Sequence, residues 1–202
     1  MKKFFLSALV FMGSMSLMAQ SAPGTVTVQP KVGLNIANMT NSDGGDPRIA
    51  LVAGAELQYQ ISDMVGISGG LLYSMQGVKG SEEGVTGTIK LDYINVPILA
   101  NIYVAKGFAV KLGIQPGFMV SNKAKVSANG VSAEVGLEKA FEASGENVSL
   151  NKFDFSIPVG LSYEFNNVVV DARYNWGVNK VVKEVDTRNS VFQITLGYKF
   201  AL

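Results

Sequence analysis

The stretch Phe153–Phe165 reads F-D-F-S-I-P-V-G-L-S-Y-E-F, and every second side chain in it is apolar or aromatic. The intervening positions carry Asp, Ser, Pro, Gly and Glu. A strict period of two predicts a β-strand with two unlike faces. The run is longer than the five or six residues usual in soluble proteins. Its length, apolar face and terminal aromatics are typical of a transmembrane β-strand.

The same alternation recurs along the rest of the chain. Eight such runs cover residues 29–38, 49–61, 65–78, 88–104, 108–120, 153–165, 168–182 and 191–200. The connections after the second, fourth and sixth runs are very short, whereas the others are long and polar. Short turns at one end and long loops at the other are typical of outer-membrane barrels. The sequence therefore predicts an all-β fold, namely an eight-stranded antiparallel up-and-down transmembrane β-barrel.

The start of the chain has the composition of a secretory signal peptide. Lys2 and Lys3 precede an uncharged apolar stretch, and Ala19 is a small residue before a plausible cleavage point. A retained membrane anchor is the alternative, but the stretch is short for a spanning helix, which needs about 20 residues. We expect a signal peptide at residues 1–19 and one barrel domain at residues 20–202. The expected location is the lipid of the outer membrane of a Gram-negative bacterium.

Aromatic residues fall near both ends of the expected strands, as two girdles at the membrane interfaces would require. The predicted girdle residues are Tyr59, Tyr73, Phe108, Phe118, Phe153, Phe165, Trp176, Phe192 and Phe200. Pro97, Pro116 and Pro158 fall inside expected strands, although proline cannot donate to a β-ladder. We expect bulges or local kinks there; a weakened seam between strands is the alternative.

Charged residues of both signs occupy the face opposite the apolar one. The predicted lumen charge network consists of Lys31, Glu56, Lys111, Asp154, Glu164, Asp171, Arg173 and Lys199. An eight-stranded barrel is just wide enough for side chains to fill its interior, and a buried charge is costly unless it is paired. We therefore expect an interior plug of ion pairs. A narrow ion path or gate is the alternative.

Composition excludes several classes of function. The chain contains no His and no Cys, which excludes imidazole and thiol catalysis, His metal sites and disulfides. Two of its 17 basic residues lie in the leader, against 16 acidic residues in all, so the mature chain has no basic excess for nucleic acid. We expect no catalytic residues, no cofactor and no metal. Residues 39–46 have a calcium-loop composition but lack the EF-hand spacing.

Four motifs resemble an outer-membrane β-barrel family that is widespread in Bacteroidetes and often called PorT-like. They are Gly70-Leu71-Leu72-Tyr73-Ser74 with Gly77, the segment L-D-Y-I-N-V-P-I-L-A at residues 91–100, D-F-S-I-P-V-G at residues 154–160, and Leu196-Gly197-Tyr198-Lys199-Phe200. The resemblance covers essentially the whole mature chain. It implies a small barrel like OmpX or the OmpA barrel domain, and it implies little about activity.

Residues 121–151 form the longest connection, where Lys and Glu alternate with Val, Leu and Phe. We expect a long loop of ordinary kind there. The alternative is that the flanking strands extend beyond the bilayer and present an exposed edge, which can bind a protein or surface ligand by strand addition. The leading hypothesis is a monomeric, non-enzymatic integral barrel with a structural or surface-interaction role through long extracellular loops. The alternatives are a component of an outer-membrane protein secretion or assembly apparatus, and a soluble lipocalin-like ligand-binding barrel.

Overall fold

The computed structural model describes residues 21–41, 45–82, 85–128, 131–143, 145 and 149–202. The expected signal peptide lies outside these residues. The elements are β1 (Val26–Met39), β2 (Asp46–Ser62), β3 (Val65–Glu82), β4 (Val85–Asn95), β5 (Ile98–Ala105), β6 (Phe108–Ala128), β7 (Val131–Gly136), α2 (Leu137–Ala143), β8 (Phe153–Phe165), β9 (Val168–Gly177), β10 (Asn189–Tyr198) and β11 (Phe200–Ala201).

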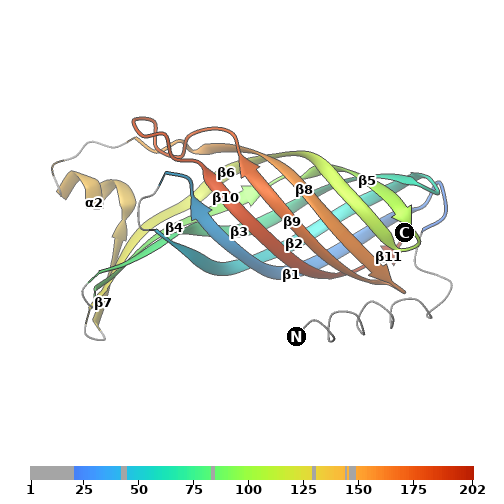
Figure 1. Cartoon of the computed structure of the whole chain (residues 1–202), viewed down its shortest axis with the longest axis horizontal. Helices are drawn as coiled ribbons and strands as arrows, with labels where there is room; N and C mark the ends of the chain where they lie inside the picture. The colour runs from blue at the N-terminus through green and yellow to red at the C-terminus, as the bar shows by residue number, and fades with distance from the viewer. Residues whose placement is uncertain (1–20, 42–44, 83–84, 129–130, 144, 146–148) are drawn as a thin grey trace, which may run out of the picture.

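The strands form one antiparallel sheet that closes on itself (Figure 1). Around the ring the order is β1, β2, β3, then β4 and β5 together, β6, β8, β9 and β10, and β10 pairs back onto β1. The ring therefore has eight wall positions in up-and-down order, as the alternating runs predict. β7 lies outside the ring and pairs with β6.

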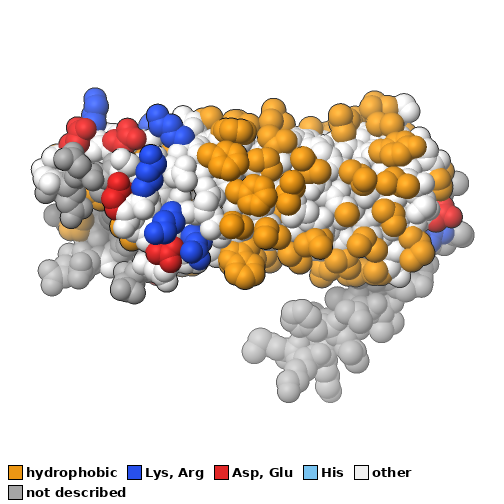
Figure 2. Space-filling view, turned by 90° about the horizontal axis from the view of Figure 1, so that it is seen from above, with side chains coloured by type: hydrophobic (Ala, Val, Ile, Leu, Met, Phe, Trp, Pro, Cys, Tyr) orange, Lys and Arg blue, Asp and Glu red, His pale blue; other side chains and the backbone are white. Residues whose placement is uncertain are grey.

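The wall has the two faces that the period of two predicts. Along β9 the burial alternates strictly between exposed and buried side chains, with one half-buried position. The exposed set is apolar and faces outward, and the buried set contains charged and amide side chains. On the face seen in Figure 2, apolar side chains form a broad band around the barrel wall. Among the described residues, no helix has both the length and the apolar content that a membrane span requires.

The two ends of the barrel differ. The turns between β2 and β3, β5 and β6, and β8 and β9 each have two residues, and they lie at one end with the C-terminus, here called the turn end. Asn166 adopts a φ of 54° in the last of these turns, a left-handed conformation that Asn tolerates. The opposite end, here called the loop end, carries β7 and α2 beyond the barrel (Figure 1).

Four predicted boundaries are wrong. The run at 88–104 is two strands, because Pro97 interrupts the ladder between β4 and β5. The run at 168–182 ends at Gly177, because the Asn179 side chain bonds the backbone of β8 instead of continuing the strand. Residues 121–151 are not simply a loop, since they contain the end of β6, β7 and α2. The predicted connection at 79–87 is mostly strand for the same reason, because β3 and β4 continue as a hairpin beyond the barrel.

The three prolines sit where the ladder is interrupted. Pro97 lies in the break between β4 and β5, and Val96 N donates to the carbonyl oxygen of Pro116 at 2.8 Å. Between β6 and β8 the paired residues stop at Leu112–Val159 and resume at Gln115–Ser156, which leaves Pro158 in the gap. The expected local kinks are therefore gaps in pairing at positions where proline has no N–H to donate.

The predicted girdle residues lie on the outer wall, where eight of the nine are exposed and Phe108 is half-buried. At the loop end, Tyr73, Ile94, Phe118 and Phe153 occupy adjacent positions on four neighbouring strands. The rings of Phe118 and Phe153 make an edge contact at 5.5 Å. At the turn end, Phe200 pairs with Val28 of β1, and the ring of Tyr198 lies 4.7 Å from that of Phe200.

Candidate functional site

All eight residues of the predicted lumen network are buried inside the barrel, but they form three separate groups. Five of them form the central charge cluster: Lys31 on β1, Glu56 on β2, Lys111 on β6, and Asp171 and Arg173 on β9. Glu164 and Lys199 form a second group, and Asp154 stands apart from both. The predicted charge network is therefore divided into three groups along the barrel.

Arg173 is the hub of the central charge cluster. Its Nε donates to Asp171 Oδ1 at 2.8 Å, and its Nη2 donates to Glu56 Oε1 at 2.9 Å and to Asp171 Oδ2 at 3.0 Å. Lys31 binds Glu56 at 2.8 Å, and Lys111 donates to Asp171 at 2.6 Å. Three cations thus share two carboxylates across the whole width of the barrel, and the side chains fill its cross-section.

A second polar layer closes the turn end. Lys199 Nζ donates to Glu164 Oε2 at 2.5 Å and to the Tyr103 hydroxyl at 3.1 Å. Gln58 Nε2 donates to the same hydroxyl at 2.9 Å. Tyr103 is therefore an interior residue that orders this layer and not a girdle residue. The available signal in the sequence was the period of two: Tyr103 alternates with Ile102 and Val104, which are exposed, and so falls on the inward face of β5.

The loop end is closed by apolar packing. Asp154 accepts a hydrogen bond from Asn189 Nδ2 at 2.9 Å, and Asn189 also donates to the Tyr93 hydroxyl at 3.2 Å. Above this group lies an apolar cap built from strand ends and loop residues. The buried members of the apolar cap are Met39, Val78, Leu91, Tyr93, Leu137, Leu150 and Val181. Two polar layers and one apolar layer thus lie at three levels of the barrel interior.

The strands β3, β4, β6 and β7 continue past the barrel as a sheet, here called the protruding sheet (Figure 1). Its two faces are inverted relative to the barrel wall. On β4 the outward side chains change from Ile94 to Asp92, Lys90 and Thr88, while the inward positions become Leu91 and Ile89. Because apolar side chains face outward only within lipid, this inversion marks the upper limit of the membrane.

The outward face of the protruding sheet is charged. Glu134 on β7 binds Lys90 at 2.5 Å and Lys123 at 2.9 Å. Hydrogen bonds from these two ammonium groups lower the pKa of the Glu134 carboxyl to about 2. The same contact raises the pKa of Lys123. Charged side chains gather at this end of the molecule in Figure 2, next to the apolar band.

The inward face of the protruding sheet is apolar, and its tip is uncovered. Val85, Val126, Val131 and Val135 are between 43 and 75% exposed on this face. Gly80 and Gly87 lie on the same face, and the missing side chains leave an open groove of about 340 Å³ beside Val78 and Val126. β7 pairs with β6 on one side, and no pairing of its other edge exists within the described ranges.

The helix α2 and the apolar cap were not predicted. The helix sequence L-E-K-A-F-E-A consists almost entirely of strong helix formers, which was a usable signal. Leu137 at its start is buried in the cap, and Phe141 packs against it. The cap itself had no periodic signal, because its buried members come from six separate segments of the chain. The calcium-like segment at 39–46 lies partly outside the described residues and stays untested.

The architecture defines a class of protein. An apolar outer wall between two aromatic belts, around a filled polar interior, is the arrangement of an integral membrane β-barrel. A lipocalin-like barrel places its apolar face inside around a ligand, so that alternative is wrong for this chain.

Sequence comparison gives the family. Residues 18–183 match the model of the outer membrane protein beta-barrel domain, and the chain belongs to this family. The protein is therefore located in the outer membrane of a Gram-negative bacterium. In barrels of this kind the short turns face the periplasm and the long loops face the outside. No curated protein sequence matches the chain.

Several solved structures are similar in fold. The attachment invasion locus protein Ail of Yersinia pestis is 18% identical, with 88% of this chain and 99% of that chain covered and a TM-score of 0.48. Neisserial surface protein A is 16% identical, with 90 and 100% covered and a TM-score of 0.49. OprG from Pseudomonas aeruginosa is 12% identical, with 91 and 99% covered and a TM-score of 0.45. At these values the likeness carries no functional conclusion.

Proposed function

We propose that this protein is a closed, monomeric, non-enzymatic barrel that binds a protein partner at the cell surface through its protruding sheet. The observation that carries the proposal is the uncovered apolar face at the tip of that sheet. Val131 is 75% exposed and Val126 is 52% exposed, on a part of the chain that lies above the membrane. Apolar side chains aligned on one face in water indicate a binding surface.

The open edge of β7 defines the kind of partner. An extended segment that adds to β7 continues the sheet by backbone hydrogen bonds and places alternate side chains on the apolar face. The groove at Gly80 and Gly87 has room for such side chains. The partner is therefore an extended, apolar peptide segment. Residues 121–151 contribute the surface through β6 and β7 and not through a loop.

The interior supports the closed state. The central charge cluster, the Glu164–Lys199 layer and the apolar cap each cross the barrel, so an ion would have to break paired charges or enter apolar packing. We expect no steady single-channel conductance in planar bilayers. A steady conductance would contradict the closed barrel and would favour the gate.

Paired substitutions on the two faces test the binding surface. Val126→Lys adds a charge to the apolar face, and Ser127→Lys adds the same charge to the opposite face of the same strand. With a photo-reactive residue at Val131 in the intact envelope, we expect a specific crosslinked partner that is lost in Val126→Lys and kept in Ser127→Lys. No crosslink, or equal loss in both variants, would contradict the proposal.

The PorT-like subgroup and a role in a secretion apparatus remain predictions. A secretion role would act through the periplasmic turns or a strand seam. Co-isolation of envelope partners with Lys106→Ala in the β5–β6 turn tests it, because loss of a partner there and not in Val126→Lys would favour the secretion role.

A further inference from the structure

The seam that closes the barrel, between β1 and β10, contains a gap near the turn end. Paired residues run from Met39–Asn189 to Lys31–Gly197 and resume only at Val28–Phe200 on β11. The two positions between, Gln29 opposite Lys199 and Pro30 opposite Tyr198, are not paired across this seam. The gap therefore lies between the first and last strands of the ring.

The hydrogen bonds around the gap explain it. Lys199 N donates to Asn167 O at 2.7 Å, and the Asn167 side chain donates to Lys199 O at 2.9 Å, so both backbone groups of Lys199 point away from β1. In an antiparallel ladder the neighbouring residue, Tyr198, then points its backbone groups toward β1. Opposite it stands Pro30, which has no N–H to donate. Of the two hydrogen bonds that such a pair exchanges, the one from the Pro30 nitrogen to the Tyr198 carbonyl oxygen cannot form.

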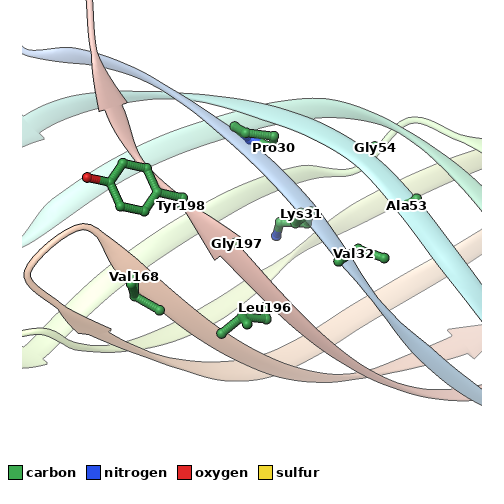
Figure 3. Close-up of a pocket in the computed structure, with 9 residues that line it drawn as sticks. All are labelled: Pro30, Lys31, Val32, Ala53, Gly54, Val168, Leu196, Gly197 and Tyr198. Carbon is green, nitrogen blue, oxygen red and sulfur yellow. The ribbon is translucent and has the colours of Figure 1, made fainter.

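An apolar groove lies on the outer wall over the same gap. Its volume is about 520 Å³, and Figure 3 shows the residues around it. Pro30 and Ala53 present short side chains outward, while Val32, Leu196, Val168 and Tyr198 stand higher on either side. The depression therefore follows from the short outward side chains of Pro30 and Ala53 between taller neighbours.

The position of the groove decides what can occupy it. Pro30 lies two residues from Val28, the partner of Phe200 in the turn-end aromatic belt, which is about 7 Å along the strand at 3.3–3.4 Å per residue. The groove therefore opens into the hydrocarbon of the periplasmic leaflet, just inside the interface. Tyr198 is exposed beside it, close to the level at which lipid headgroups begin.

We propose that this groove is a specific binding site for one acyl chain of a phospholipid from the periplasmic leaflet. The chain lies over Pro30 and Ala53 between the ridges formed by Val32 and Leu196. It fills the depression over the incomplete Pro30–Tyr198 pair, and the Tyr198 hydroxyl is placed to bond the ester or headgroup. The site is separate from the surface on the protruding sheet, which lies at the other end of the barrel.

The test is native mass spectrometry of the folded full-length protein. The protein is taken from vesicles of phosphatidylethanolamine and phosphatidylglycerol into a mild detergent, and the phospholipid that remains bound is counted. Ala53→Phe fills the groove, and Ala100→Phe adds the same ring to the outer wall on β5. We expect one retained phospholipid in the wild type and in Ala100→Phe, and roughly tenfold less in Ala53→Phe, because losing contact with a few methylene groups changes affinity by about this factor.

No retained phospholipid in the wild type, or equal retention in the two variants, overturns the proposal. A mass of two protein chains that disappears in Ala53→Phe also overturns it, because the occupant is then a second copy. Heat-modifiable migration on a gel verifies that each variant is folded. If Ala53→Phe does not fold, Pro30→Phe fills the groove from the other strand and is read against the same control.

Discussion

The central charge cluster allows a prediction whose direction depends on charge balance. The five side chains carry three positive and two negative charges, so the cluster has a net charge of +1. Asp171 lies within 4 Å of all three cations, at 2.6 Å from Lys111, 2.8 Å from Arg173 and 3.8 Å from Lys31. Asp171→Asn keeps the size of the side chain but leaves three buried cations with Glu56 alone. Removing one partner of a buried pair typically costs about 3–5 kcal/mol.

Lys31→Met is the matched control, since it removes a charge from the same cluster but leaves it neutral. Glu56 then keeps Arg173 at 2.9 Å, so no carboxylate is orphaned. We expect Lys31→Met to cost at least about 2 kcal/mol less than Asp171→Asn, because a buried charge left without a partner carries the main penalty. Asp171→Asn combined with Lys111→Met should recover part of the loss, with a coupling of about 0.5–3 kcal/mol.

The free energy of unfolding is measured by urea titration of protein folded into lipid vesicles, with the folded fraction read from heat-modifiable migration on a gel. Since native stabilities are about 5–15 kcal/mol, the expected loss in Asp171→Asn is a large shift of the midpoint. The reasoning is refuted if Lys31→Met is as destabilising as Asp171→Asn, or if neither variant changes the midpoint. In the first case packing, and not charge balance, would hold the cluster.

Three further predictions concern the closing seam, the polar layer at the turn end and the protruding sheet. Gly33→Ala should prevent stable folding, because its Cβ would lie 1.9 Å from a carbonyl oxygen of β10, whereas Gly80→Ala has open space and should fold normally in the same gel assay. Tyr103→Phe removes a hydroxyl that bonds two buried side chains and should cost about 1–2 kcal/mol in urea unfolding; an unchanged midpoint would contradict its role in the turn-end layer. The carboxyl of Glu134 should titrate near pH 2 by NMR, since its pKa is lowered to about 2, and Lys90→Met should move the midpoint up toward the ordinary 4.5. The folded-state pKa is depressed, so the contribution of this contact to stability is fully present above pH 4.5 and is lost as pH falls toward 2.

The local sequence pattern was sufficient to predict strands and turns that depend only on neighbouring residues. The alternating run Phe153–Phe165 has the same first and last residues as β8. The match is complete because the whole strand lies in the barrel wall, with one face toward lipid and one toward the lumen, and a turn or loop follows at each end. The two-residue turn Asn166-Asn167 could be predicted in the same way, because Asn tolerates the left-handed conformation that the turn requires. The pattern misled at residues 168–182, where apolar Val181 belongs to the apolar cap and not to a strand. Hydrophobic residues of loops and of strands are alike in sequence, and only packing separates them.

The protruding sheet shows where the period of two stops being informative. Beyond Ile94 and Phe118 the strands continue with the same period, but water replaces lipid, so the charged side chains take the outward face. The period shows that two faces exist and does not say which of them is charged and which is apolar. The exposed edge in residues 121–151, which was the alternative to an ordinary loop, is present as β7, whereas α2 and the apolar cap depend on contacts between distant segments.

By itself the sequence determined the fold, the apolar outer wall and the set of charges that lie inside, because the alternation of side chains across a strand requires nothing beyond neighbouring residues. Only the tertiary structure decided how those charges group. Glu56 and Arg173 are separated by 117 positions and meet at 2.9 Å, while Asp154 lies on the same face as Glu164 but at the other end of the barrel. The period of two decides whether a side chain faces the lumen or the lipid. Its height along the barrel axis depends instead on the register of every strand against its neighbours. The same register places Pro30 opposite Tyr198 and so opens the gap in the closing seam.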